Sequence, residues 1–344
     1  MTRRQLLFTV PAAALAASDR TTMGVATTSY ALKGAGDPLA FLDYCHSLGA
    51  GGVQMGLRNA DPGAVRARAE KHGMWVEAFL GLPADTAAVE GFERSVVAAK
   101  AAGATVARIA MLGGRRYETF ETLESFRQFA QRSWKSLTLA EPVARQHRFY
   151  LAIENHKDWR IDEMLAMLNR ISSQWVGVTV DTGNSIALLE DPMAVVEAYA
   201  PYALATHIKD MGVEEYPDGF LLSEVPLGEG FLDLPRIVQT LTRARPGVKL
   251  ALEMMTRDPL KIPVLTAKYW ATFPERKASE LAAGLALVRV KKSARPLPRI
   301  TGLSREQQLE LEDRNVRLCL AWSRNQLSVV SCQLSVLGGM TTGS

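Results

Sequence analysis

Four side chains that commonly bind metal ions recur in the second half of this 344-residue chain. They are Glu154, Asp181, His207 and Glu253, and each stands at the carboxyl end of an apolar segment that is predicted to be a β-strand. Three carboxylates and one imidazole repel one another at close range unless a cation lies between them. An oxygen-rich set with one nitrogen suits Mn²⁺, Mg²⁺, Co²⁺ or a catalytic Zn²⁺. The four residues therefore predict a site for one divalent metal ion.

The residues next to these four alternate between small and bulky side chains. Such alternation with a period of two puts the two sets on opposite faces of their strands. We expect the small set to face the interior of a barrel and the bulky set to lie under helices. The small set is Ala152, Gly177, Thr179, Ala203, Ala205 and Ala251. The bulky set is Leu151, Ile153, Val176, Val178, Val180, Leu204, Ile208, Leu250 and Leu252.

Eight short apolar segments alternate with amphipathic stretches along the chain. They span residues 23–30, 51–57, 74–82, 105–112, 148–155, 175–184, 202–210 and 248–255. Strands that alternate with helices predict a parallel sheet, and eight such units fit a single closed (β/α)8 TIM barrel, here over residues 19–300. The alternative is a doubly wound open sheet, but the glycine-rich phosphate turn typical of that fold does not follow the first segment. In a TIM barrel the carboxyl ends of all strands meet at one mouth, which would bring the four metal-binding side chains together.

The overall composition excludes several classes of protein. Hydrophobic residues make up 47% of the chain, and 40 basic residues face 36 acidic ones, a net charge of +4. This composition is not that of a disordered chain, and the small basic excess argues against a nucleic-acid partner. Three cysteines are too few for a disulfide framework and do not have metal-ligand spacing.

The first 18 residues have the three-part pattern of a secretory signal peptide: a charged start, an apolar run and then small residues. Arg3 and Arg4 make the segment similar to a twin-arginine signal, which exports folded proteins. We therefore expect a periplasmic or secreted protein, and no later segment is long and apolar enough to predict a membrane helix. A frayed N-terminal helix with two arginines is the alternative.

The end of the chain predicts a helix followed by a tail. Residues 301–325 contain an amphipathic helix whose first turn has a capping box of Ser304 and Gln307. The helix is expected to pack on the outside of the barrel or between copies in a homo-oligomer. Residues 326–344 contain a repeated Gln-Leu-Ser-Val and are interpreted as a disordered tail, with a strand or a dimerising segment as the alternative.

Five motifs in the second half of the chain resemble those of the xylose isomerase-like TIM barrels. They are AIENHKDW (152–159), VTVDTGN (178–184), ATHIKD (205–210), PLGEGFLDL (226–234) and LALEMM (250–255). That superfamily includes sugar-phosphate isomerases and epimerases, ketose 3-epimerases, inosose dehydratases and hydroxypyruvate isomerases. The resemblance implies that Glu154, Asp181, His207 and Glu253 bind one divalent metal. It also implies that the two glutamates are the catalytic acid–base pair on either side of a sugar.

The implied function is that of a divalent-metal-dependent sugar isomerase or epimerase. Such an enzyme transfers a proton at the carbon next to a carbonyl through a metal-bound enediolate. The same groups can eliminate a substituent, so a lyase or dehydratase acting on a keto sugar or a 3-keto-glycoside is the first alternative. A non-catalytic exported sugar-binding barrel is the second. Because export is expected, we predict a substrate without phosphate.

Four neighbouring residues are candidates for substrate binding. His156 and Lys209 each follow a metal-binding residue by two positions, so each shares its direction and can contact a substrate oxygen. Asn184 stands where ketose epimerases of the superfamily carry a histidine, which puts ketose-epimerase specificity in doubt. Arg257 lies just beyond Glu253 and is a candidate substrate-binding arginine. The alternative for each is an ordinary surface side chain. DNA repair by a three-zinc endonuclease is disfavoured, because that site needs further histidines.

Overall fold

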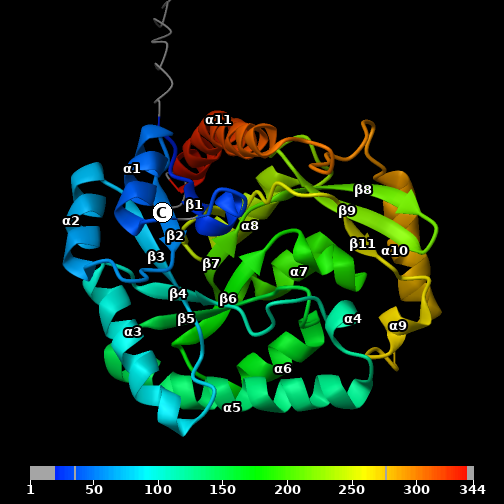
Figure 1. Ribbon diagram of the computed structural model, residues 1–344, viewed down its shortest axis with the longest axis horizontal. Coiled ribbons are helices and arrows are strands. Elements are labelled where there is room, and N and C mark those ends of the chain that lie inside the picture. Colours follow the sequence, from blue (N-terminus) through cyan, green and yellow to red (C-terminus); the bar gives the residue numbers. More distant parts are fainter. Residues whose placement is uncertain (1–19, 35, 276, 339–344) are drawn as a thin grey trace, which may run out of the picture.

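The computed structural model describes residues 20–34, 36–275 and 277–338, so the predicted signal at residues 1–18 lies outside the described residues. Eight parallel strands form a barrel at the centre of the molecule (Figure 1). They are β1 (Gly24–Ala26), β2 (Gly52–Met55), β3 (Trp75–Leu80), β4 (Val106–Ile109), β5 (Tyr150–Glu154), β6 (Val176–Asp181), β7 (Ala203–His207) and β10 (Ala251–Leu252). β1 pairs with β10, and Ile208 closes the ring by donating to the Ala251 carbonyl at 2.7 Å. The predicted TIM barrel is confirmed.

Seven helices of the outer ring lie between successive strands of the barrel. They are α1 (Pro38–Ser47), α2 (Pro62–His72), α3 (Val89–Ala101), α5 (Leu123–His147), α6 (Ile161–Ile171), α7 (Pro192–Tyr199) and α8 (Leu234–Ala244). Short helical turns join them: η1 (Thr27–Tyr30), η2 (Thr86–Ala88), α4 (Arg116–Thr119), η3 (Asn184–Leu188) and η4 (Ala200–Tyr202). Three helices, α1, α2 and α7, begin with an aspartate N-cap followed by proline. The aspartate side chain accepts a hydrogen bond from a free amide of the first turn, and the proline presets the backbone.

The C-terminal helix α11 (Arg305–Gly338) completes the ring as its eighth helix. It contacts α8 and η1, and Val316 and Leu320 are fully buried in the same core as the barrel strands. Glu312 accepts hydrogen bonds from the backbone of Leu32 and Lys33 after β1, at 2.6 and 3.0 Å. The sequence places this helix outside the barrel unit and ends it at residue 325, whereas the structure extends it through Gly338. No helix in the described part of the chain has the length and apolarity needed to cross a bilayer.

A second, smaller sheet stands beside the barrel and was not predicted. It contains β8 (Asp210–Tyr216), β9 (Gly219–Val225) and β11 (Leu260–Ile262), all antiparallel. α9 (Ala267–Trp270) and α10 (Ala278–Val290) follow β11, and α10 packs against the sheet (Figure 1). Phe220, Leu222 and Ile262 belong to a hydrophobic core separate from that of the barrel. The sequence predicts only a long loop before the eighth barrel strand. The turn Pro217-Asp218-Gly219 between two apolar runs was the missed hairpin signal.

The alternation of small and bulky side chains holds for most of the barrel but fails on β7. Ala152 and Ala205 pack together inside the barrel, and Ile153 and Val178 lie in the core under the helices. On β7 the predicted directions of Ala203 and Leu204 are wrong: Ala203 is in the outer core, and Leu204 packs against the interior cluster. The cause is a register shift, because Val178 pairs with Ala203 and Thr179 pairs with Ala205, which leaves Leu204 as an extra residue.

We predict that α11 contributes to the stability of the barrel. Replacing the fully buried Leu320 with alanine should lower the free energy of unfolding by about 2–5 kcal/mol, because a cavity forms in the shared core. Leu318 on the same helix is 39% exposed, and Leu318→Ala should change that free energy by about 0.5 kcal/mol or less. Urea denaturation followed by circular dichroism measures both. If both substitutions change the free energy of unfolding by equally small amounts, the helix does not stabilise the barrel.

Candidate metal centre

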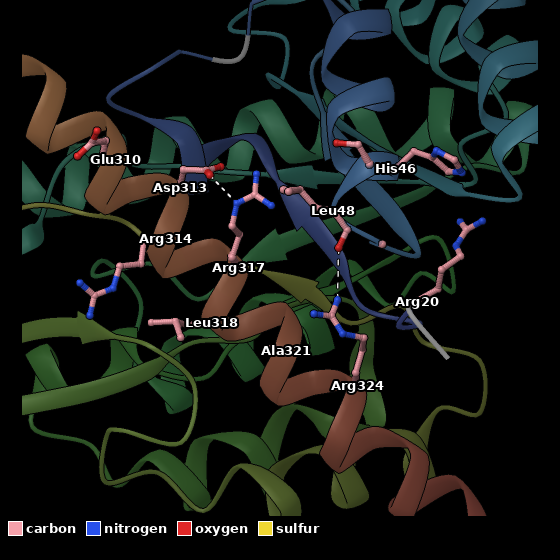
Figure 2. A pocket seen from close by; sticks show the side chains of 12 residues that line it. Arg20, His46, Leu48, Glu310, Asp313, Arg314, Arg317, Leu318, Ala321 and Arg324 are labelled. Carbon is pink, nitrogen blue, oxygen red and sulfur yellow. Dashed lines mark hydrogen bonds and ion pairs between the residues drawn. The ribbon is translucent and has the colours of Figure 1, made fainter. Parts of the chain in front are cut away.

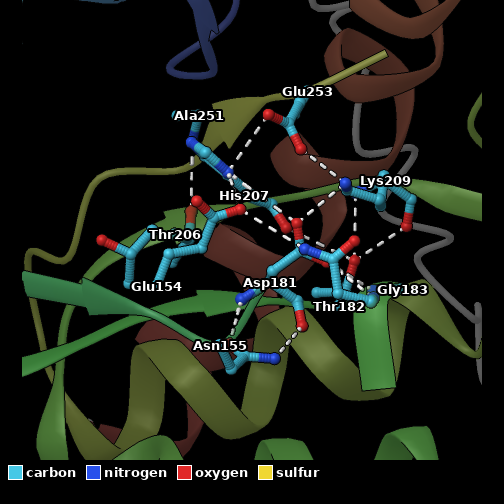
Figure 3. A network of polar contacts seen from close by, with 12 residues as sticks. Glu154, Asn155, Asp181, Thr182, Gly183, Thr206, His207, Lys209, Ala251 and Glu253 are labelled. Atoms are coloured by element: carbon cyan, nitrogen blue, oxygen red, sulfur yellow. Dashed lines mark hydrogen bonds and ion pairs between the residues drawn. The ribbon is translucent and has the colours of Figure 1, made fainter. Parts of the chain in front are cut away.

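The barrel brings the four predicted metal-binding residues to one place. Glu154, Asp181 and His207 are the last residues of β5, β6 and β7, and Glu253 directly follows β10. One ligand atom from each lies within 4.8 Å of the others, and all four side chains are buried. Figure 3 shows their carboxylates turned toward the imidazole of His207. The cluster forms because parallel strands in a barrel end at the same mouth.

The arrangement of donor atoms fits a divalent cation. Nδ1 of His207 lies 3.3 Å from Glu154 Oε1, 3.4 Å from Glu253 Oε1 and 3.8 Å from Asp181 Oδ2. Asp181 Oδ1 accepts hydrogen bonds from the backbone of Gly183 and Asn184, whereas its buried Oδ2 lies 2.8 Å from Nζ of Lys209 and faces His207. Three buried carboxylates around one imidazole nitrogen repel one another unless a cation lies between them, so this donor set is suited to a divalent metal ion.

Two residues that the sequence analysis missed orient His207. Nε2 of His207 lies 2.5 Å from Oε1 of Gln54 on β2, and Gln54 in turn donates to Glu77 on β3 at 2.9 Å. Because Oε1 can only accept, Nε2 carries a proton, which leaves Nδ1 as the nitrogen that can bind a metal ion once its own proton is lost. Burial raises the pKa of Glu77 to about 7. Gln54 and Glu77 interrupt apolar strands at inward positions, which was the available sequence signal.

Each glutamate turns one oxygen toward His207 and the other toward a cation. Oε2 of Glu154 forms an ion pair with Arg108 on β4, and Oε2 of Glu253 lies 2.5 Å from Nζ of Lys209. Burial acts to raise the pKa of Glu154, but the charges of Arg108 and His207 outweigh it and lower that pKa well below its usual range. The charges of His207 and Lys209 likewise overcome burial and lower the pKa of Glu253. Both groups are therefore carboxylates at neutral pH.

Lys209 and Asn184, two of the predicted substrate-binding residues, contact the metal-binding set directly. Lys209 is fully buried, with Nζ 2.8 Å from Asp181 Oδ2. Asn184 Nδ2 lies 3.3 Å from Glu154 Oε1, and its Oδ1 accepts from the buried Lys157.

The other two predicted residues lie at the same mouth. Burial and the charge of Lys157 lower the pKa of His156 to about 4, so this side chain is neutral at pH 7. Arg257 donates to both oxygens of Glu224 on β9, at 2.6 and 3.2 Å. Lys157 and Glu224 were not singled out from the sequence.

A groove of about 950 Å³ lies between α11 and the loop that follows α1 (Figure 2). Leu48 and Gly49 in this lining precede β2, which puts the groove at the end of the barrel where strands begin. Its arginines include Arg317, which pairs with Asp313 at 2.6 Å. The metal-binding cluster is at the opposite ends of the strands, where TIM-barrel enzymes carry their active sites. The groove is therefore no part of the candidate centre.

A family model described as "Xylose isomerase-like TIM barrel" matches residues 42–282, a span that contains the whole cluster. The chain belongs to this family. Solved xylose isomerase-like barrels share its fold at low sequence identity. A D-psicose 3-epimerase structure in the presence of D-fructose has a TM-score of 0.59 and 14% identity, covering 89% of this chain and 99% of that one. A 3-keto-D-glucoside 4-epimerase from E. coli has a TM-score of 0.53 and 14% identity, covering 79% and 100%.

A dehydratase and a decarboxylase are also similar to this chain. A probable 3-DHS dehydratase from Bacillus anthracis has a TM-score of 0.52 and 15% identity, covering 78% of this xylose isomerase-like chain and 98% of that one. The 3-oxo-isoapionate decarboxylase of Pectobacterium atrosepticum is 33% identical over 102 residues. That segment spans 29% of this chain and 37% of the decarboxylase. The chain thus shares its fold with epimerases and a probable dehydratase, and part of its sequence is similar to that of a decarboxylase.

We predict that the purified, metal-stripped protein binds about one Mn²⁺ per chain and that Asp181→Asn weakens this binding at least about tenfold. Asp162 on α6 is an exposed aspartate away from the cluster, and Asp162→Asn is the matched control that should leave binding unchanged. Isothermal titration calorimetry measures both. Equal affinity of the two variants would contradict the assigned centre.

We also predict that metal binding releases a proton at pH 7. Burial acts to lower the pKa of His207, but the charges of Glu253 and Glu154 raise it well above its usual value in the metal-free protein. His207 is therefore protonated below that pKa and must lose its proton to bind metal, so affinity should fall about tenfold for each pH unit of acidification. Calorimetry in two buffers of different ionisation enthalpy counts the proton. A heat independent of the buffer would contradict the prediction.

Proposed function

We propose that this protein is a divalent-metal-dependent sugar isomerase or epimerase that moves a proton at a carbon next to a carbonyl. The observation that supports this most is the pair of ionised glutamates, Glu154 and Glu253, on either side of one predicted metal position. When bound there, a divalent ion polarises the substrate carbonyl and stabilises the negative charge that develops on its oxygen. The two carboxylates then supply the acid–base chemistry.

The residues divide the proton transfer between them. One glutamate removes the proton from carbon and later releases it to solvent, while the other takes up a proton from solvent and donates it on the opposite face, which inverts that carbon and gives epimerisation. Return of the proton to the neighbouring carbon gives isomerisation instead. Arg108 and Asn184 hold Glu154 in place, and Lys209 supplies a fixed positive charge close to the developing oxyanion.

A lyase is the second candidate, supported by the similarity to a 3-oxo-isoapionate decarboxylase. In a decarboxylation of a 3-keto acid, the bond to the carboxylate carbon breaks and carbon dioxide leaves. The electron pair stays on the carbon next to the carbonyl, whose developing oxyanion the same centre would stabilise, and a glutamate that has taken up a proton from solvent then donates it to that carbon. The two reactions share every group of the site and differ only in the substrate bond that breaks.

We predict that the metal-loaded protein exchanges deuterium from D₂O into the carbon next to the carbonyl of its sugar substrate. Proton NMR of a panel of ketoses, aldoses and 3-keto-glycosides reports this exchange. Glu154→Gln and Glu253→Gln should each slow it by about 10²-fold or more, whereas Glu90→Gln, on an exposed part of α3, should not. Carbon dioxide release would favour the lyase. Metal retention with no turnover across the panel would favour a non-catalytic sugar-binding barrel.

We further propose that residues 1–18 direct export by the twin-arginine route, which would make the enzyme periplasmic or secreted. The proposal is supported by Arg3 and Arg4 before the apolar run. In a bacterial host, the natural chain should be recovered as a shortened form outside the cytoplasm. The doubly substituted chain Arg3→Lys, Arg4→Lys should stay full-length in the cytoplasmic fraction. Equal distribution of the two by mass spectrometry would contradict export by this route.

A further inference from the structure

Three cationic side chains reach the mouth of the barrel from three different loops. Lys157 follows β5, Lys209 lies between β7 and β8, and Arg257 follows β10. Lys157 and Lys209 are only 2% and 1% exposed, and the Arg257 side chain is 22% exposed. Burial of a charge is costly unless an opposite charge lies close to it. The negative charge available to these three side chains therefore decides what the cluster can bind.

Arg257 and Lys209 share one carboxylate on the small sheet, Glu224. Arg257 binds both of its oxygens, and Nζ of Lys209 lies 3.9 Å from Oε1. The closer partners of Lys209 are Asp181 and Glu253, which also belong to the metal-binding set. Once those two carboxylates engage a divalent ion, they no longer neutralise Lys209.

Lys157 has even less negative charge close to it. Its ammonium contacts the amide oxygen of Asn184, which carries no formal charge. Burial and the neighbouring charges of Lys209 and Arg257 lower the pKa of Lys157 to about 8. A buried lysine beside two other cations is a costly arrangement, and an anion between them would relieve it.

The total charge at the mouth also favours binding of an anion. Apart from His207, four carboxylates face four cations in the metal-free protein. The carboxylates are Glu154, Asp181, Glu224 and Glu253, and the cations are Arg108, Lys157, Lys209 and Arg257. Two further buried acids, Glu77 and Asp158, are held toward their neutral forms because burial raises the pKa of each to about 7. A bound divalent ion therefore leaves an excess of positive charge.

His156 provides a separate sign of a missing ligand. Its buried Nδ1 makes no hydrogen bond to any described residue. His156 follows Glu154 by two residues and precedes Lys157, which places the imidazole at the same mouth. A buried polar atom without a protein partner is available to hydrogen-bond to water or to a ligand.

We propose that Lys157, Lys209 and Arg257 form a subsite for an anionic group of the substrate, a carboxylate or a phosphate, beside the metal centre. The inference rests on the proposed function and narrows its substrate from sugars in general to sugar acids or sugar phosphates, of which only sugar acids agree with the phosphate-free substrate expected of an exported protein. Glu224 positions Arg257 in this subsite, and the unpartnered Nδ1 of His156 is available to the same ligand.

Three probes of one carbon skeleton test the subsite in the Mn²⁺-loaded protein. D-Fructose carries a hydroxymethyl group next to its carbonyl, 2-keto-D-gluconate carries a carboxylate there, and D-fructose 1-phosphate carries a phosphate ester. Calorimetry at constant ionic strength should show at least one anion binding about tenfold more tightly than D-fructose. Lys157→Met should weaken binding of that anion about tenfold and leave D-fructose binding unchanged. The favoured anion identifies the charged group.

The control variant is Lys71→Met on α2, an exposed lysine remote from the mouth, which should bind all three probes like the natural protein. Metal content is measured for each variant, because a keto acid can also bind the metal directly. An equal effect of Lys157→Met on all three probes, or no effect, would overturn the subsite. Deuterium exchange into sugars without any anion binding that depends on Lys157 would keep the proposed function and remove the subsite. Anion binding that depends on Lys157, without any deuterium exchange, would keep the subsite and remove the proposed function.

Discussion

Three carboxylates share one buried space around the imidazole of His207, and their mutual repulsion is the constraint on which the rest of the structure depends. Such a group is stable only with positive charge inside it or beside it. The protein supplies part of that charge itself, through Arg108 on one glutamate and Lys209 on the other. The positive charge that is still needed to offset the carboxylates would lie next to Nδ1 of His207, between the three side chains. The proposed metal site and the proposed acid–base pair thus have one electrostatic origin.

The barrel keeps this repelling group in place by fixing each member from outside the cluster. The chain Gln54–Glu77 holds the far side of His207, and backbone amides of the turn after β6 hold one oxygen of Asp181. α11 closes the ring of helices around the strands that carry these residues. Rigid strands and a packed core restrict relaxation, so the carboxylates cannot separate to relieve their repulsion.

The small sheet beside the barrel contributes a residue to the mouth that the barrel strands do not supply. The candidate metal-binding residues all lie at ends of barrel strands, whereas Glu224, which holds Arg257, comes from the inserted strand β9. In the proposed subsite, this sheet therefore positions a group that binds substrate, while the barrel positions the groups proposed for the chemistry. Barrels with the same fold include a D-psicose 3-epimerase and a probable dehydratase, so the side chains at the mouth and not the fold decide the reaction.

The sequence by itself determined the eight strands, their order and the four metal-binding side chains at their ends, because these follow from short periodic patterns and strand length. Only the tertiary structure decided that Arg108 pairs with Glu154, that Gln54 orients His207 and that Lys157 lies among other cations. These contacts join segments that become neighbours only when the barrel closes. The extra residue Leu204 and the place of α11 in the ring were likewise decided by register and packing between distant segments, which a local pattern does not contain.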